Sequence, residues 1–151
     1  MAVLALTFAT RPASAQAHGS SAAAQPELKW GPAPTIFPAG AQMAVLQGNP
    51  GGTELFTVRL RMPNGYKIPP HIHPTDENVT VISGAFRVGM GKTFDATKTM
   101  ELKAGGFVTA PAHEAHFAVA VGPTIVQVHA IGPFAMTYVN AADTPPAASS
   151  K

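Results

Sequence analysis

The stretch that decides the fold runs from Gly65 to Gly84 and reads GYKIPPHIHPTDENVTVISG. His71 and His73 are two residues apart, so on an extended strand both side chains project from the same face. A carboxylate follows at Glu77, and the residues after it alternate between apolar and polar, as in a strand. Two imidazoles and a carboxylate that converge from β-structure are typical ligands of a first-row transition metal. The stretch therefore predicts a metal site built on strands.

The composition limits what else the chain can be. It has 151 residues, a length that predicts one domain, and 46% of them are hydrophobic against 12% charged. The formal net charge is only +2 and no basic run is present, which argues against nucleic acid as a partner. There is no cysteine, so disulfides, thiolate-held zinc, iron–sulfur clusters and thiol nucleophiles are excluded. Any metal must be held by nitrogen and oxygen atoms.

The middle of the chain, residues 35–140, has an almost wholly β pattern. Short apolar or alternating runs are separated by turns rich in glycine and proline, and no segment has the periodicity of a long helix. This predicts an all-β fold, a single small barrel, sandwich or jelly roll with little or no helix. The expected strands are Gln42–Gln47, Leu55–Met62, Glu77–Ser83, Phe86–Met90, Gly106–Ala110, His116–Val121, Ile125–Ile131 and Met136–Asn140.

The two ends of the chain differ in composition from the middle. Residues 1–17 hold a short apolar run and small-residue cleavage patterns, and they predict a secretory signal peptide and hence export to the periplasm or the extracellular space. Residues 18–34 are expected to be a flexible lead-in and residues 141–151 a disordered tail. Cleavage directly before His18 would give it a free amine that can chelate a metal together with its imidazole. No later segment is long and apolar enough to span a membrane.

The histidine stretch resembles the first motif of the cupin superfamily, G-x5-H-x-H-x3-E-x6-G. The match has no gap, and it falls on Gly65, His71, His73, Glu77 and Gly84. The resemblance implies a single small β-barrel of jelly-roll type over residues 35–140. Since cupins commonly dimerise through their sheets, it also implies a homodimer.

The second cupin motif, G-x5-P-x-G-x2-H-x3-N, is matched in part. Gly105, Pro111 and His116 fit it, whereas His113 replaces its glycine and Ala120 its asparagine. The two motifs together imply a metal site of three histidines and one glutamate. The ligands implied by the resemblance are His71, His73, Glu77 and His116.

Such a ligand set suits one divalent transition metal per chain. Imidazole and carboxylate bind manganese, iron, cobalt, nickel, copper and zinc, and nitrogen-rich sites bind copper more tightly than its divalent neighbours. Since export also relaxes the cell's control over copper, copper is favoured, with iron, manganese and zinc as alternatives.

Two further histidines are candidates for the site. If Val121–Thr124 forms a tight turn, His116 pairs with His129, and cross-strand partners share a face. His129 is then expected to point into the barrel, where it could relay protons to the metal site; the alternative is a core histidine bonded to the backbone. His113 lies in the loop before His116, either at the rim of the site or as a solvated loop residue.

The fold alone does not settle the function. A compact exported domain with an intact ligand set favours a metal-dependent oxidoreductase that activates dioxygen or peroxide. Its substrate is expected to be a small molecule or a carbohydrate, for example a polysaccharide cleaved oxidatively. The alternatives are a non-redox metal-dependent sugar isomerase or hydrolase, with the metal as Lewis acid, and a non-catalytic module that binds a small ligand.

Overall fold

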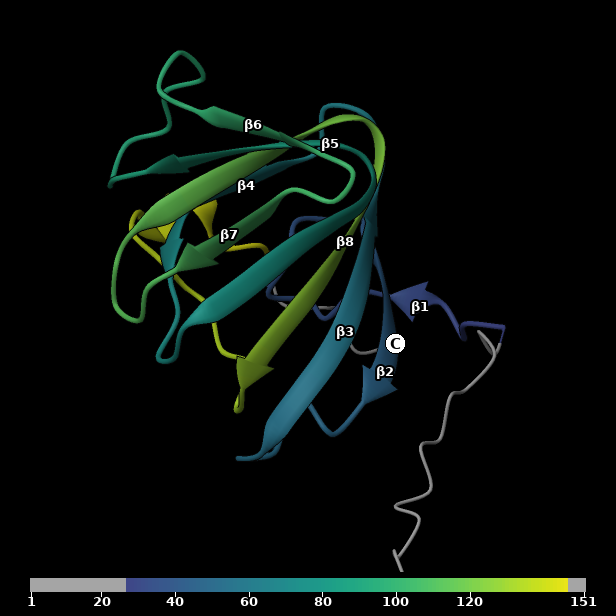
Figure 1. The fold of residues 1–151 in the computed structure, drawn as a ribbon. Coiled ribbons are helices and arrows are strands. Elements are labelled where there is room, and N and C mark those ends of the chain that lie inside the picture. The colour runs from purple at the N-terminus through teal and green to yellow at the C-terminus, as the bar shows by residue number, and fades with distance from the viewer. Residues whose placement is uncertain (1–26, 147–151) are drawn as a thin grey trace, which may run out of the picture.

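The computed structural model describes residues 27–146. The expected signal peptide at residues 1–17, His18 and the last residues of the expected tail lie outside the described residues. Within them the chain forms nine strands and one 3₁₀ turn (Figure 1). These are β1 (Gly31–Pro32), β2 (Gln42–Gln47), β3 (Leu55–Met62), β4 (Lys67–Ile72), β5 (Glu77–Met90), β6 (Met100–Lys103), β7 (Phe107–Ala110), β8 (His116–Ile131), β9 (Thr137–Tyr138) and η1 (Ala141–Asp143).

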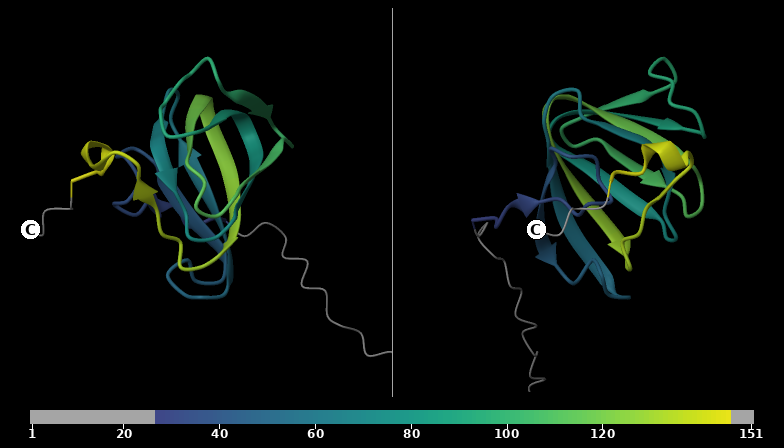
Figure 2. Two further views of the ribbon diagram at one scale, coloured as in Figure 1. Left: turned by 90° about the vertical axis from the view of Figure 1, so that its left-hand side faces the viewer. Right: turned by 180° about the vertical axis from the view of Figure 1, so that it is seen from behind.

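The strands form one antiparallel sheet that curls into a barrel. Its order is β1-β2-β3-β8-β4-β9, and β5 pairs with β6, β7 and β8. The two longest strands, β5 and β8, pair from Asn78↔His129 to Met90↔His116. Because both bend midway, each contributes to two walls of the barrel, as the three views show (Figures 1 and 2). The all-β jelly-roll fold with essentially no helix is confirmed.

The bend of the long ladder explains why Gly84 is glycine. Gly84 has a φ of +78°, a left-handed conformation that side chains rarely adopt. A Cβ there would lie 2.5 Å from the Pro123 carbonyl oxygen and 2.7 Å from Thr124 Oγ1. Here the two bent strands approach each other too closely for any side chain.

In two places, a pair of strands expected from the sequence is one continuous strand. Glu77–Ser83 and Phe86–Met90 are one strand, β5, and His116–Val121 and Ile125–Ile131 are one strand, β8. The expected hairpin at Val121–Thr124 therefore does not form. Gly84 in β5 and Gly122 with Pro123 in β8 mark a shared bend, where the ladder shifts register near Ser83.

Strands β4 and β6 were not expected. Strand β4 contains Pro69 and Pro70, which lack the N–H that a ladder needs, so the sequence argues against a strand there. The structure accommodates the prolines with a shift of register between Ile68 and His71. Strand β6 is short and three of its four residues are exposed, so it carries a weak apolar signal.

Ordered structure extends beyond both expected ends of the domain. Strand β1 lies in the expected lead-in, where Gly31 pairs with Met43 on β2. The turn η1 opens the expected tail, and it is capped because the side chain of Asn140 accepts a hydrogen bond from the N–H of Ala142 at 3.1 Å. The described residues contain no helix long and apolar enough to cross a membrane.

The core lies inside the barrel and follows the alternation of its strands. On β3 the inward side chains of Phe56, Val58, Leu60 and Met62 are at most 2% exposed. Each such side chain contributes about 1.5–3 kcal/mol by leaving water. This core fixes the register of the walls, and thereby the positions of the side chains that point inward.

Candidate metal centre

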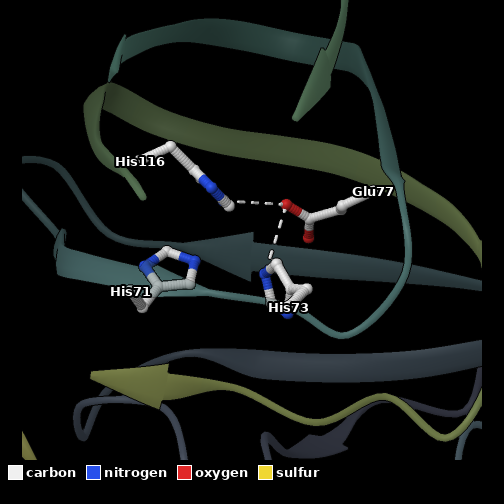
Figure 3. Close-up of side chains that lie close together, drawn as sticks. All are labelled: His71, His73, Glu77 and His116. Carbon is white, nitrogen blue, oxygen red and sulfur yellow. Dashed lines mark ion pairs between the residues drawn. The ribbon is translucent and has the colours of Figure 1, made fainter. Parts of the chain in front are cut away.

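Four side chains converge inside the barrel: His71, His73, Glu77 and His116 (Figure 3). One nitrogen or carboxylate oxygen from each lies within 4.8 Å of the others. The three histidines are 3% exposed and Glu77 is 9% exposed. The structure thus brings together all four ligands implied by the cupin resemblance.

Each of these residues is positioned at or near the end of a strand. His71 is on β4, and His116 is the first residue of β8. The two are cross-strand partners, so their rings face the same side and their centroids lie 4.3 Å apart. His73 follows β4 by one residue, and Glu77 opens β5 after the chain has turned back.

All three imidazoles are held in one tautomer by the backbone. The Nδ1 atoms of His71, His73 and His116 lie 2.7, 2.7 and 3.2 Å from the carbonyl oxygens of Pro69, Ala135 and Glu114. A carbonyl oxygen only accepts hydrogen bonds, so Nδ1 of each neutral ring must carry the proton and Nε2 the lone pair. Metal-binding histidines are oriented in the same way by a hydrogen bond from their other nitrogen.

Two of the Nε2 atoms have no protein partner. Those of His73 and His116 are buried and make no hydrogen bond. Native structures rarely leave a buried polar atom unsatisfied, because desolvation without a partner costs free energy. Both atoms point toward the Glu77 carboxylate, whose Oε2 lies 3.5 Å from His73 Nε2 and 3.4 Å from His116 Nε2 (Figure 3). This arrangement fits a metal ion, which would satisfy both lone pairs.

The protonation states favour cation binding. Burial lowers the pKa of His71 to about 3, helped by the neighbouring His116, so this ring is neutral at physiological pH. Burial by itself would raise the pKa of Glu77, but contact with His116 and His73 holds it well below its usual range, so Glu77 is a carboxylate. Burial also acts to lower the pKa of His73, yet the contact with Glu77 leaves it raised. A divalent cation bound between Glu77 and the histidines would replace any proton that these side chains share.

A small chamber adjoins the four residues. Its free volume is about 30 Å³, enough for one or two water molecules or a diatomic gas. Apart from the four cluster residues, every lining residue is apolar, and none carries a charge. They are Phe37, Leu60, Ile68, Val79, Phe86, Val88, Val108, Ala110, Ala118, Val126 and Val128.

The structure does not bring His129 to this site. Val128 and Ala130 point into the core at 0% and 4% exposure, so His129 between them lies on the outer face of β8. There its Nδ1 lies 3.0 Å from the hydroxyl of Thr57 on β3. The expectation of an inward proton relay is wrong because β8 bends but continues past the expected hairpin, so His116 pairs with Met90 on β5 and not with His129.

His113 lies in the loop before β8 with an exposed side chain. Its φ is +63°, which explains why cupins have glycine at this motif position. Its backbone N–H donates a hydrogen bond to the carbonyl oxygen of His73 at 2.8 Å, so the loop holds a ligand residue through the main chain.

The variant His113→Gly tests this interpretation. We expect it to stabilise the metal-free protein by up to about 1 kcal/mol, because glycine removes left-handed strain that outweighs its greater freedom in the unfolded chain. Urea unfolding would measure the change. Metal affinity should stay the same, and a loss of affinity would instead assign the side chain of His113 to the site.

Sequence reasoning missed two aromatic residues beside the cluster. The ring of Phe134 stacks on His73 with centroids 5.3 Å apart and an angle of 15° between planes. Phe37, which lines the chamber, packs on Phe134 at 5.9 Å. Neither belongs to a motif, and no local pattern could place residues so distant in sequence beside His73.

Comparisons with known proteins agree with this fold. Residues 58–132 match the family model described as "Cupin domain". The polyketide cyclase RemF from Streptomyces resistomycificus is 19% identical with a TM-score of 0.63, covering 79% of this chain and 84% of its own. An RmlC-like cupin from Shewanella frigidimarina is 21% identical with a TM-score of 0.56, covering 70% and 84%.

An oxalate oxidase is a third similar structure, at 23% identity and a TM-score of 0.53. The match covers 76% of this chain but only 64% of the oxalate oxidase. No curated protein matches the chain. At these identities the structural matches show the fold alone. The matched family model and the cluster of His71, His73, Glu77 and His116 make this chain similar to the cupin superfamily, as a small domain with a His/Glu cluster of the metal-binding kind.

Proposed function

We propose that the protein is a metal-dependent oxidoreductase that activates dioxygen or peroxide at one divalent transition metal per chain. The proposal is carried by the buried Nε2 atoms of His73 and His116, which lack protein partners and face the Glu77 carboxylate. A bound copper, iron or manganese ion would supply the redox chemistry. Copper is our first candidate because a nitrogen-rich site favours it.

The residues of the chain would hold and shield this ion. Backbone carbonyls fix the three rings so that Nε2 faces the cluster, and the neutral state of His71 leaves its lone pair available. Glu77 would offset part of the charge of the cation. The apolar lining of the chamber limits water around the site and strengthens the electrostatic interactions inside it.

The chamber favours a small uncharged molecule as the one that enters. Its lining offers no cation for a carboxylate substrate and no polar group beyond the cluster for the hydroxyls of a sugar. Dioxygen fits a free volume of about 30 Å³, whereas a sugar ring does not. A carbohydrate substrate would have to meet the site from outside the barrel, so we rank small molecules ahead of carbohydrates.

A non-redox function is the second candidate. Three imidazoles and a carboxylate also suit zinc, which would act as a Lewis acid in an isomerase or hydrolase. The same set would serve a module that binds a small ligand without catalysis. These alternatives share the ligands of the first proposal and differ in the metal.

The metal can be identified directly. We expect elemental analysis of the purified protein to find about one transition metal per chain, and electron paramagnetic resonance to show a mononuclear signal that changes on reduction. Oxygen consumption would then be screened with small organic reductants. A stoichiometric zinc protein without a redox signal would overturn the oxidoreductase and favour the second candidate. Full turnover after complete removal of metal would contradict every metal-dependent version.

Export and a homodimer are further parts of the proposal. Among the described residues β7 pairs only with β5, so its other edge is free to pair, and Phe107 on it is 57% exposed. Fractionation of the producing cells tests export. Sedimentation at several concentrations tests the dimer.

A further inference from the structure

The chamber beside the cluster is lined in part by a residue from a loop outside the barrel strands. Its lining residues belong to strands β3, β4, β5, β7 and β8, with two exceptions. One is His73, directly after β4. The other is Phe37, from the loop between β1 and β2. Because the strands form the walls, a side chain that enters from outside them must fill an opening between them.

Phe37 is well packed in this opening. It is only 5% exposed, and its ring contacts that of Phe134, which in turn stacks on His73. A direct line of aromatic contacts therefore connects the loop to a residue of the cluster. Figure 2 shows the segment that carries β9, in yellow, on the same side of the barrel as the segment after β1, in purple.

Two tyrosines clasp the loop on either side of Phe37. The hydroxyl of Tyr138 on β9 donates to the carbonyl oxygen of Ile36 at 2.7 Å, and that of Tyr66 before β4 donates to the carbonyl oxygen of Pro38. Burial raises the pKa of both hydroxyls, with the charge of Asp143 adding to the effect at Tyr138, whose pKa rises to about 12. Both hydroxyls therefore stay protonated donors at physiological pH.

Apart from the packing of Phe37, the loop has few other contacts that fix it, and its hydrogen bonds to the rest of the protein are few. Its base is closed by the hydrogen bond from the Ala33 N–H to the Ala41 carbonyl oxygen at 3.0 Å. Within the part of the chain that the structure describes, the only hydrogen bonds from residues 34–38 to the barrel are the two from the tyrosines. A segment held at its base, by one packed side chain and by two side-chain hydrogen bonds can open without unfolding the sheet.

We propose that residues 34–38 form a gate over the chamber, and that Phe37 determines the size of the molecules that reach the cluster. Phe37 lies outside residues 58–132, the part of the chain that matches the family model. The role of Phe37 in the choice of substrate rests on the proposed function. The test of the gate does not, because it measures how accessible the histidines are in the metal-free protein.

The test uses diethyl pyrocarbonate, an uncharged reagent that modifies unprotonated imidazole. Peptide mass mapping gives the modification rate of each histidine, and the exposed His113 and His129 serve as references within the same molecule. In the wild type we expect the cluster histidines to react at least about tenfold more slowly than the references, since they react only when the gate opens. Phe37→Ala should raise their rate at least about tenfold and leave the references unchanged.

Phe94→Ala is the matched control. Phe94 is a partly buried phenylalanine that packs on Phe117 at 5.0 Å and does not line the chamber, so its loss should not expose the cluster. The double variant Tyr66→Phe with Tyr138→Phe keeps both rings and removes only the clasp. It should speed the reaction of the cluster histidines several-fold, and it carries the test if Phe37→Ala does not fold.

Two outcomes would overturn the gate. One is a wild type whose cluster histidines react as fast as His129. The other is a folded Phe37→Ala or double tyrosine variant that reacts no faster than Phe94→Ala. If the protein binds no metal but its cluster histidines are modified at the expected rates, the proposed function is wrong and the gate is still supported.

Discussion

Replacing His73 with alanine is expected to lower the affinity for the transition metal at least about 100-fold, more than the loss of a residue that merely orients a ligand. The reason is geometric, since the Nε2 of His73 is buried and unpartnered beside Glu77. Alanine removes one of three nitrogen donors, and no other histidine among the described residues belongs to the cluster. Competition with a chelator of known affinity measures the loss, and circular dichroism tests whether the fold persists.

His129→Ala is the control for this experiment. It also removes a histidine from a strand of the barrel, but from the outer face, where the ring contacts Thr57. Its metal affinity should stay within about twofold of the wild type, within the usual scatter of distant surface changes. If His71→Ala and His116→Ala both keep full metal content, the assignment of the ligands is wrong.

The sequence predicts this cluster well because the information is local. The spacing of His71 and His73 and the short return to Glu77 constrain one stretch of chain, and the match to a known motif supplies His116. The structure adds the reason that His116 joins them, which is its direct pairing with His71 across β4 and β8. That register cannot be read from the spacing of residues so far apart in sequence.

The two divided strands and the misplaced His129 share one cause, which is that long-range pairing overrides local turn signals. Gly122 and Pro123 predict a hairpin turn, and a hairpin there would put His129 inside the barrel. In the structure β8 runs on, because β5 pairs with it on both sides of the bend. A strand that bends with its partner and a strand that folds back on itself have the same local sequence signature, yet the two alternatives put His129 on opposite faces.

Gly84→Ala tests that shared bend, and we expect it to destabilise the metal-free protein by about 2–5 kcal/mol. Two effects add. Alanine at a φ of +78° is strained. Its Cβ would also lie 2.5 Å from the Pro123 carbonyl oxygen, and only a movement of the backbone could relieve this contact. The midpoint of urea unfolding, with its slope unchanged, measures the loss.

Gly122→Ala separates the two effects. Its φ is +73°, close to that of Gly84, but a Cβ there would meet nothing within 4 Å. It should therefore cost only the left-handed strain, about 1–2 kcal/mol. The difference between the two variants measures the close approach of β5 and β8 at the bend. If both lose equal stability, the strands have room to separate, and the last glycine of the histidine motif is there for its backbone conformation alone.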